Sequence, residues 1–202
     1  MASELSVINT ALAHLGEERQ LSDLEADPAP REQRVARALL PQIRDAMLRE
    51  QPWLCAERRL TVTRVPLDRP ADWKFANVFL LPPTMLRLWL ADTSEPYQVG
   101  PYVEMNPDMT EKSRRRALFT NASGPLHVTI IDQIDYEHFD ASLTDAVSYE
   151  LASRMAGPLQ ADKALAKSLK GDAEDAKILA ATIQTSEITE EPAPRGRWLS
   201  GR

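Results

Sequence analysis

Three parts of this sequence carry side chains that could do chemistry: one cysteine, a stretch rich in acids, and a run of arginines. Cys55 is the only thiol, and it stands in the apolar segment 53–56, with the sequence WLCA. A nucleophilic cysteine needs an accessible and electropositive surrounding that stabilises the thiolate. The sequence therefore predicts that Cys55 is a small buried hydrophobic side chain.

The acid-rich stretch contains five ionisable side chains: Asp132, Asp135, Glu137, His138 and Asp140. It lacks the glycine and the spacing of a calcium loop, and no second histidine lies at ligand spacing from His138. Acidic side chains at the start of a helix stabilise the positive end of its dipole. We therefore interpret the stretch as a strand-to-helix loop, and we predict no metal and no cofactor.

The arginine run comprises Arg114, Arg115 and Arg116, with Lys112 close by. It could contact a phosphate or an acidic partner, but charge runs are commonly just exposed to solvent. An exposed loop is therefore the interpretation that we favour.

Motifs and composition exclude several classes of protein. There is no GxSxG, P-loop, GxGxxG, CxxC or HExxH motif, so we predict that the protein is not an enzyme. A net charge of -6 argues against a dedicated nucleic-acid binder, because such proteins use a basic surface to displace counterions. A single cysteine fits folding in a reducing cytosol. With no signal-peptide pattern and no long uncharged apolar run, we expect a soluble cytoplasmic protein without membrane contact.

Two helices are expected near the start of the chain. Residues 3–15 have Ser3 as a candidate N-cap and Gly16 in the place of a left-handed C-terminal cap. Residues 32–50 contain Pro41, which removes one backbone hydrogen bond, so we expect one kinked helix rather than two. The apolar stripes are Leu5, Ile8, Leu12 and Leu15 in the first helix, and Val35, Leu39, Ile43 and Met47, widened by Leu40 and Leu48, in the second.

The middle third of the chain is expected to form strands. Alternating apolar residues indicate strands within residues 60–65, 86–90 and 128–134. In the second run Leu86, Leu88 and Leu90 are expected to share one face. The chain has 15 prolines and only 7 glycines, and many of the prolines separate these runs. The pattern predicts a small antiparallel β lobe with long connections.

Two further helices are expected after residue 140. The first has Asp140 or Ser142 as its cap and Gly157-Pro158 as its stop. In the second, alanines on the apolar side would permit a close approach to another helix. The expected apolar stripes are Leu143, Val147, Leu151 and Met155 in the first, and Leu165, Leu169, Ala173, Ala176, Leu179 and Ile183 in the second.

The sequence as a whole predicts an α+β fold, mainly an α-helical bundle of about four helices with a small antiparallel β lobe and an extended C-terminal tail. Residues 1–56 would supply the N-terminal helices of the bundle, 57–136 the β lobe, 137–186 the C-terminal helices of the same bundle, and 187–202 the tail. A solvated tail has no need of Trp198, whose burial against a partner would contribute a few kcal/mol. The residues predicted to bind a partner are Pro192, Pro194, Arg195, Arg197, Trp198, Leu199 and Arg202.

Four stretches of the chain, in order, carry a family resemblance. They are residues 11–17 (ALAHLGE), residues 36–53 (ARALLPQIRDAMLREQPW), residues 79–88 (FLLPPTMLRL), and the pair of helices expected over 143–183 with the polar, tryptophan-containing tail behind them. In this order the chain resembles the head-to-tail adaptors of short-tailed bacteriophages, the tail tubular protein A family.

The resemblance implies a structural ring subunit at the head-tail junction of a virion, made in the cytoplasm of the bacterial host. The ring would be a homo-oligomer, a dodecamer, stacked between the portal protein and the tail nozzle or tube. In such adaptors the helical bundles pack side by side, the C-terminal tail inserts between portal subunits, and the β lobe faces the next tail component. DNA would leave through the central channel without specific binding.

Two alternatives come from other classes of protein. A small tail-associated hydrolytic enzyme would need a paired acid and base, for which Glu137 and Asp140 are the candidates. A helical DNA-binding regulator would use Arg114 to Arg116, and its DNA affinity would depend on salt.

Overall fold

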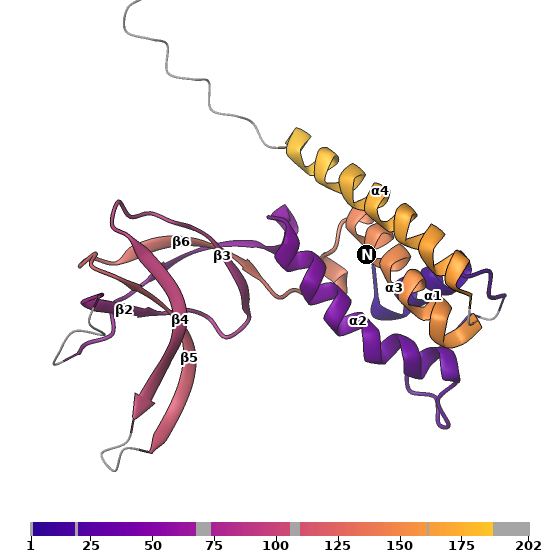
Figure 1. Ribbon diagram of the computed structural model, residues 1–202, viewed down its shortest axis with the longest axis horizontal. Helices are drawn as coiled ribbons and strands as arrows, with labels where there is room; N and C mark the ends of the chain where they lie inside the picture. Colours follow the sequence, from indigo (N-terminus) through magenta and orange to yellow (C-terminus); the bar gives the residue numbers. More distant parts are fainter. Residues whose placement is uncertain (1, 19, 68–73, 106–109, 161, 188–202) are drawn as a thin grey trace, which may run out of the picture.

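The fold is that of a computed structural model, which describes residues 2–18, 20–67, 74–105, 110–160 and 162–187. These residues form a helical unit at one end of the molecule's long axis and a β lobe at the other (Figure 1). The mixed α+β class, the four helices and the antiparallel strands agree with the prediction. Of the tail predicted over 187–202, Glu187 is the last residue of a helix, and residues 188–202 lie outside the described residues.

The helical unit is arranged around its third helix, which packs against the other three. Its helices are α1 (Glu4–His14), α2 (Arg31–Glu50), α3 (Ala141–Gln160) and α4 (Lys163–Glu187). The apolar stripe predicted for α3 is confirmed, since Leu143, Val147, Leu151 and Met155 are all fully buried.

The β lobe consists of two three-stranded antiparallel sheets that share an apolar core. One sheet has the order β1-β6-β3 and the other β2-β5-β4. The strands are β1 (Glu57–Val62), β2 (Asn77–Leu80), β3 (Met85–Ala91), β4 (Tyr97–Met105), β5 (Glu111–Thr120) and β6 (Leu126–Asp132). Short 3₁₀ turns, η1 (Leu54–Ala56) and η2 (Tyr136–His138), connect the lobe to the helical unit.

Both ends of α1 are capped as its sequence predicts. The Ser3 hydroxyl accepts a hydrogen bond from the Ser6 amide at 3.1 Å, and the Ser6 hydroxyl accepts one from the Ser3 amide at 2.7 Å. Gly16 has a φ of 76°, the left-handed conformation expected of a C-terminal cap.

The second helix continues unbroken through Pro41, as one helix rather than two, but its predicted stripe is wrong in part. Ala36, Leu40, Ile43 and Met47 are buried, whereas Val35 and Leu39 are only half-buried. The reason is helical geometry. A strict four-residue spacing drifts by roughly 40° per step, while alternating steps of four and three residues stay on one face.

The prediction that α3 stops at Gly157-Pro158 is wrong, because the helix continues to Gln160. Tertiary hydrogen bonds stabilise this last turn. The Arg31 guanidinium donates to the Pro158 carbonyl, and the Gln160 amide donates to the Leu15 carbonyl at 2.9 Å. Local sequence signals do not report such contacts with residues far away in the chain.

The stripe predicted for α4 is wrong in its C-terminal half. Leu169 and Ala173 are buried as expected, but the buried line continues through Lys177 and Ala180. Lys177 is buried because its ammonium group contacts two carboxylates, Glu50 at 3.1 Å and Glu174 at 3.0 Å. Burial opposes the charge, but these hydrogen bonds outweigh it and raise the pKa of Lys177.

The strands differ from the prediction in two respects. Leu90 is 58% exposed and does not share a face with Leu88, because a bulge between them shifts the pairing from Ile130 to Thr129. Three strands, β2, β4 and β5, were not expected. Pro101 lies within β4, which is an edge strand and has no second neighbour that would need its amide.

Candidate partner-binding surfaces

The acid-rich stretch positions α3. The Asp140 carboxylate accepts hydrogen bonds at 2.7 Å from the Leu143 amide and at 2.7 Å from the Ser142 hydroxyl, so Asp140 is the cap that the sequence predicts. The Asp132 carboxylate forms an ion pair with Arg58 at 2.8 Å. The interpretation as a strand-to-helix loop is therefore confirmed. Among the residues that the structure describes, no group of three His, Cys, Asp or Glu side chains is placed to hold a metal ion.

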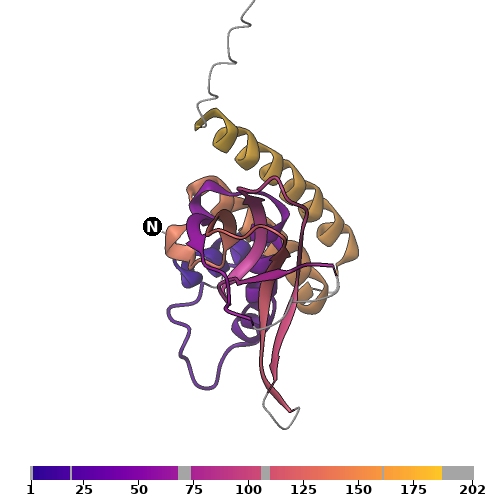
Figure 2. The same ribbon diagram turned by 90° about the vertical axis from the view of Figure 1, so that its left-hand side faces the viewer.

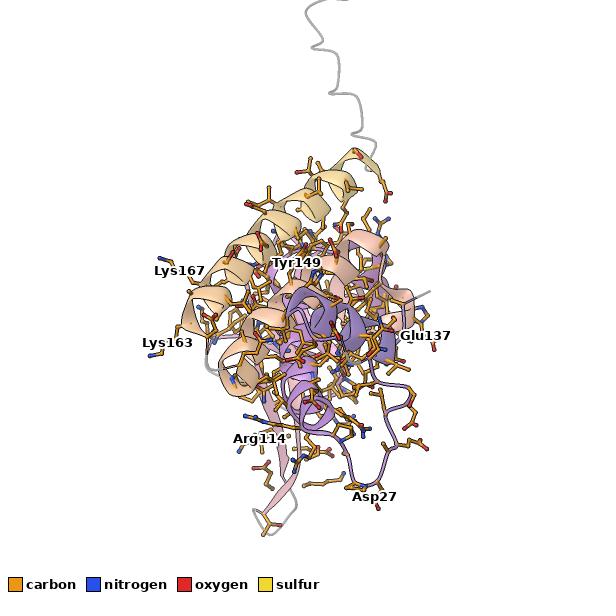
Figure 3. The ribbon with its side chains drawn as sticks, turned by 90° about the vertical axis from the view of Figure 1, so that its right-hand side faces the viewer. Asp27, Arg114, Glu137, Tyr149, Lys163 and Lys167 are labelled. Carbon is orange, nitrogen blue, oxygen red and sulfur yellow. The ribbon has the colours of Figure 1, made fainter. Side chains whose placement is uncertain are left out.

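Glu137 and Asp140, the acid and base considered for a hydrolase, have different surroundings. Glu137 is exposed at the surface of the helical unit (Figure 3), where it lines an open hollow with Glu4 and Arg44. Asp140 is not among the residues that line this hollow, and its carboxylate is engaged in capping α3. The two carboxylates therefore do not line this hollow together.

Cys55 is half-buried in η1 and packs against the core of the helical unit. Burial raises the pKa of its thiol to about 11, and the nearby Asp140 carboxylate acts in the same direction. A thiol in this state is protonated at neutral pH and is a poor nucleophile. Cys55 therefore behaves as the sequence predicts, as an apolar side chain, although it is not fully buried.

Alkylation of Cys55 by iodoacetamide at pH 8 should be about a hundredfold slower in the folded protein than in urea, since two pKa units change the thiolate fraction by that factor. Folding raises this pKa from 9.0 to about 11, so the thiol's contribution to stability is present below pH 9 and is lost as the pH rises toward 11. The native alkylation rate should accordingly keep rising with pH above pH 9, where the rate in urea levels off. Equal rates in the two states would contradict this.

The arginine run lies in strand β5 and not in a loop, so that prediction is wrong. The Arg116 guanidinium points back into the lobe and donates to the carbonyls of Met85 at 2.7 Å and Leu86 at 3.2 Å, which ties one sheet to the other. Arg114 pairs with Glu111 at 2.9 Å, and this contact lowers the pKa of the Glu111 carboxyl. Arg115 is exposed. With Leu81 and Pro83, the three arginines line a hollow of about 510 Å³.

A second surface feature is apolar. Ile178, Leu179 and Ile183 of α4 are 64%, 60% and 44% exposed, although the sequence pattern assigns Leu179 and Ile183 to the core. We call these three residues the α4 patch. In Figure 1 this helix lies along the outer side of the helical unit, and its last turns extend past α3. No sequence signal reveals the patch, because the burial of Lys177, which turns these residues outward, depends on Glu50, far away in the chain.

The predicted partner-binding residues, from Pro192 to Arg202, all lie outside the residues that the structure describes. What the structure adds is the α4 patch, whose last residue, Ile183, lies only a few residues before the tail in the sequence. No helix among the described residues is both long and apolar enough to cross a membrane. Comparison with known proteins gives no further guide, because no family model and no curated protein matches this sequence.

Proposed function

We propose that the protein is a structural neck subunit of a bacteriophage, which forms a ring that joins the portal to the tail and provides a channel for DNA ejection. It would act at the head-tail junction of the virion and would catalyse no reaction. The ring is expected to be a homo-oligomer, a dodecamer as in the adaptors that the sequence resembles. Its partners would be its own copies, the portal protein and the tail nozzle or tube.

The observation that carries this proposal is the α4 patch. Three large apolar side chains within six positions of one helix are exposed, while the rest of the helical unit has a closed core. Clustered exposed apolar groups on a globular protein commonly mark an interaction site. Completely burying an exposed side chain of this size contributes roughly 1.5–3 kcal/mol, and covering the exposed part of these three would contribute about half of that for each, which favours assembly.

The stretches that carry the family resemblance also occupy structurally important places. Residues 36–53 form most of α2 and end at Trp53, whose indole is fully buried and donates to the Met47 carbonyl at 2.7 Å. Residues 79–88 form the corner between β2 and β3, where Phe79 and Met85 are buried. The resemblance therefore rests on residues that build the fold, as expected of a shared architecture.

The tail would supply the contact with the portal. Its prolines limit the entropy lost on ordering, and Trp198 with its neighbouring arginines belongs to the residue types enriched at interfaces. A helix that ends with an apolar patch and continues into such a tail offers one extended surface for a large assembly. DNA would pass the acidic subunits without being bound, since a net charge of -6 repels phosphates.

The test is assembly with purified portal rings, observed by negative-stain electron microscopy. The full chain should form a stacked complex, and deletion of residues 196–202 should abolish it while the circular dichroism spectrum stays unchanged. Replacing Leu179 and Ile183 together with glutamine should also reduce assembly. A matched control replaces the exposed Thr182 and Thr185 of the same helix with glutamine and should assemble normally. Failure of the full chain to bind portal, or unchanged assembly after the deletion, would contradict the proposal.

A further inference from the structure

One part of the β lobe projects beyond its sheet. Strand β2 pairs with only the last four residues of β5, and the final bond on that edge runs from the Leu81 amide to the Arg116 carbonyl at 3.0 Å. Beyond this point β4 and β5 pair only with each other. We call residues 101–105 and 111–116 the ribbon. At about 3.4 Å per residue, the part of the ribbon without a third strand beside it extends roughly 17 Å beyond the end of β2. Figures 1 and 2 show it projecting from the lobe.

The ribbon concentrates positive charge on an acidic protein. Its four cations are Lys112 and the three arginines, and its two carboxylates are Glu104 and Glu111, while the sequence between its two strands adds a third acid, Asp108. Both carboxylates are engaged within the ribbon, because Lys112 contacts Glu104 at 2.6 Å and Arg114 contacts Glu111. These contacts lower the pKa of both carboxyls, and they leave Arg115 exposed and without an ion pair among the described residues.

The complementary charge lies at the other end of the molecule. The connection between α1 and α2 carries four exposed carboxylates, Glu18, Asp23, Glu25 and Asp27, which we call the acidic loop. None of the four makes an ion pair within the part of the chain that the structure describes. Figure 3 shows Asp27 at the outer end of this connection. Unpaired like charges repel one another, so a cationic partner would stabilise them.

We propose that the ribbon of one copy docks on the acidic loop of the next copy. The two surfaces lie at opposite ends of the long axis, and both project on the same side of the molecule (Figures 1 and 2). A contact between two different surfaces of identical chains is heterologous, and its repetition closes a ring when the rotation permits. The inference rests on the proposed ring and identifies the contact that gives it direction.

The charges would fix orientation more than affinity. Exposed ion pairs contribute little individually, but complementary patches steer association and exclude wrong registers. Duplex DNA is the less suitable occupant of the ribbon. Two of its cations are neutralised by glutamates, and Arg116 donates to backbone carbonyls, whereas a DNA-binding surface needs many cations free for phosphates.

The test is a charge exchange between the two surfaces. One variant carries Arg114→Glu and Arg115→Glu, with Arg116 retained because it ties the sheets together. The other carries Asp23→Lys, Glu25→Lys and Asp27→Lys. Each variant alone should need an at least roughly tenfold higher concentration to form rings, as measured by mass photometry at low salt, because like charges then meet at every contact. A control with Arg34→Glu and Arg59→Glu, two exposed arginines outside the ribbon, should form rings as the wild type does.

The decisive sample is an equimolar mixture of the two variants. A reversed ribbon then meets a reversed loop and an original ribbon meets an original loop, so alternating rings should form although neither variant forms them alone. If the wild type forms rings and both variants form them equally well, the inference is overturned and the proposed function is left intact. Loss of salt-dependent affinity for duplex DNA in the ribbon variant, with rings unaffected, would overturn it in favour of a DNA contact. A wild type that forms no ring, alone or on portal, would defeat both proposals.

Discussion

Replacing Trp53 with alanine should lower the free energy of unfolding by about 3–5 kcal/mol, the range typical of a fully buried aromatic side chain. Trp53 has no exposed surface, and its indole N–H donates to the Met47 carbonyl at 2.7 Å. It lies between α2 and η1, where the chain turns toward the β lobe. The substitution would leave a cavity in the core and a buried carbonyl near the end of α2 without its donor. Urea denaturation followed by circular dichroism measures the change.

The matched control is Trp89→Ala. Trp89 lies in β3 and is 44% exposed, and the central carbon of the Arg87 guanidinium lies 4.9 Å from the centre of its ring. Losing this exposed contact should cost about 1 kcal/mol or less. Equal losses for the two tryptophans would show that Trp53 does not anchor the core.

Where the fold depends on short-range signals, the sequence predicts it well. The cap of α1 needs only Ser3, Ser6 and Gly16, and the cap of α3 needs only Asp140 and the amide three residues later. The stripe of α3 is correct because this helix packs on three sides and its large apolar residues have no alternative to burial. In each case the deciding atoms lie within a few residues of one another.

Where the fold depends on distant contacts, the sequence pattern fails. The burial of Lys177 requires Glu50, which is far away in the chain, and the exposure of Leu179 follows from it. The strands β4 and β5 are rich in charged and small residues, and alternation cannot reveal them because much of the ribbon has no buried face. Arg116 could not be told apart from its neighbours, since only the fold brings it to the carbonyls of β3.

The candidate surfaces were predictable to a similar extent. The arginine run and the partner-binding tail are visible in composition alone, as the charge and the isolated tryptophan show. The acidic loop and the α4 patch could be identified only from the structure. For the α4 patch the reason is that a sequence pattern assigns an apolar residue on a helix to the core. The acidic loop has a partner-binding interpretation because it lies at the end of the molecule opposite the ribbon. The α4 patch has one because it lies on the outer side of the helical unit.

Replacing Phe79 with alanine should destabilise the β lobe by about 3–5 kcal/mol and leave the helical unit largely protected. Phe79 is fully buried in the core that the two sheets share, which is a different cluster of buried residues from the core of the helical unit. Cavities act on the residues that surround them, so the loss should be concentrated in the strands. Hydrogen exchange measured by mass spectrometry should show faster exchange in β2 and β5 and little change in α3.

The matched control is Tyr97→Ala, which removes an aromatic side chain that is 43% exposed at the start of β4 in the same sheet as Phe79. This change should alter exchange only slightly, because little apolar surface returns to water. If Phe79→Ala instead accelerates exchange in α3 as much as in β5, the two cores unfold as one cooperative unit. The folding of the ribbon would then depend on the stability of the whole subunit. Substitutions in either core would weaken the contact between copies to a similar extent. If exchange rises only in the strands, the helical unit can present the α4 patch while the ribbon is loosened, so portal binding and ring closure become separable by mutation.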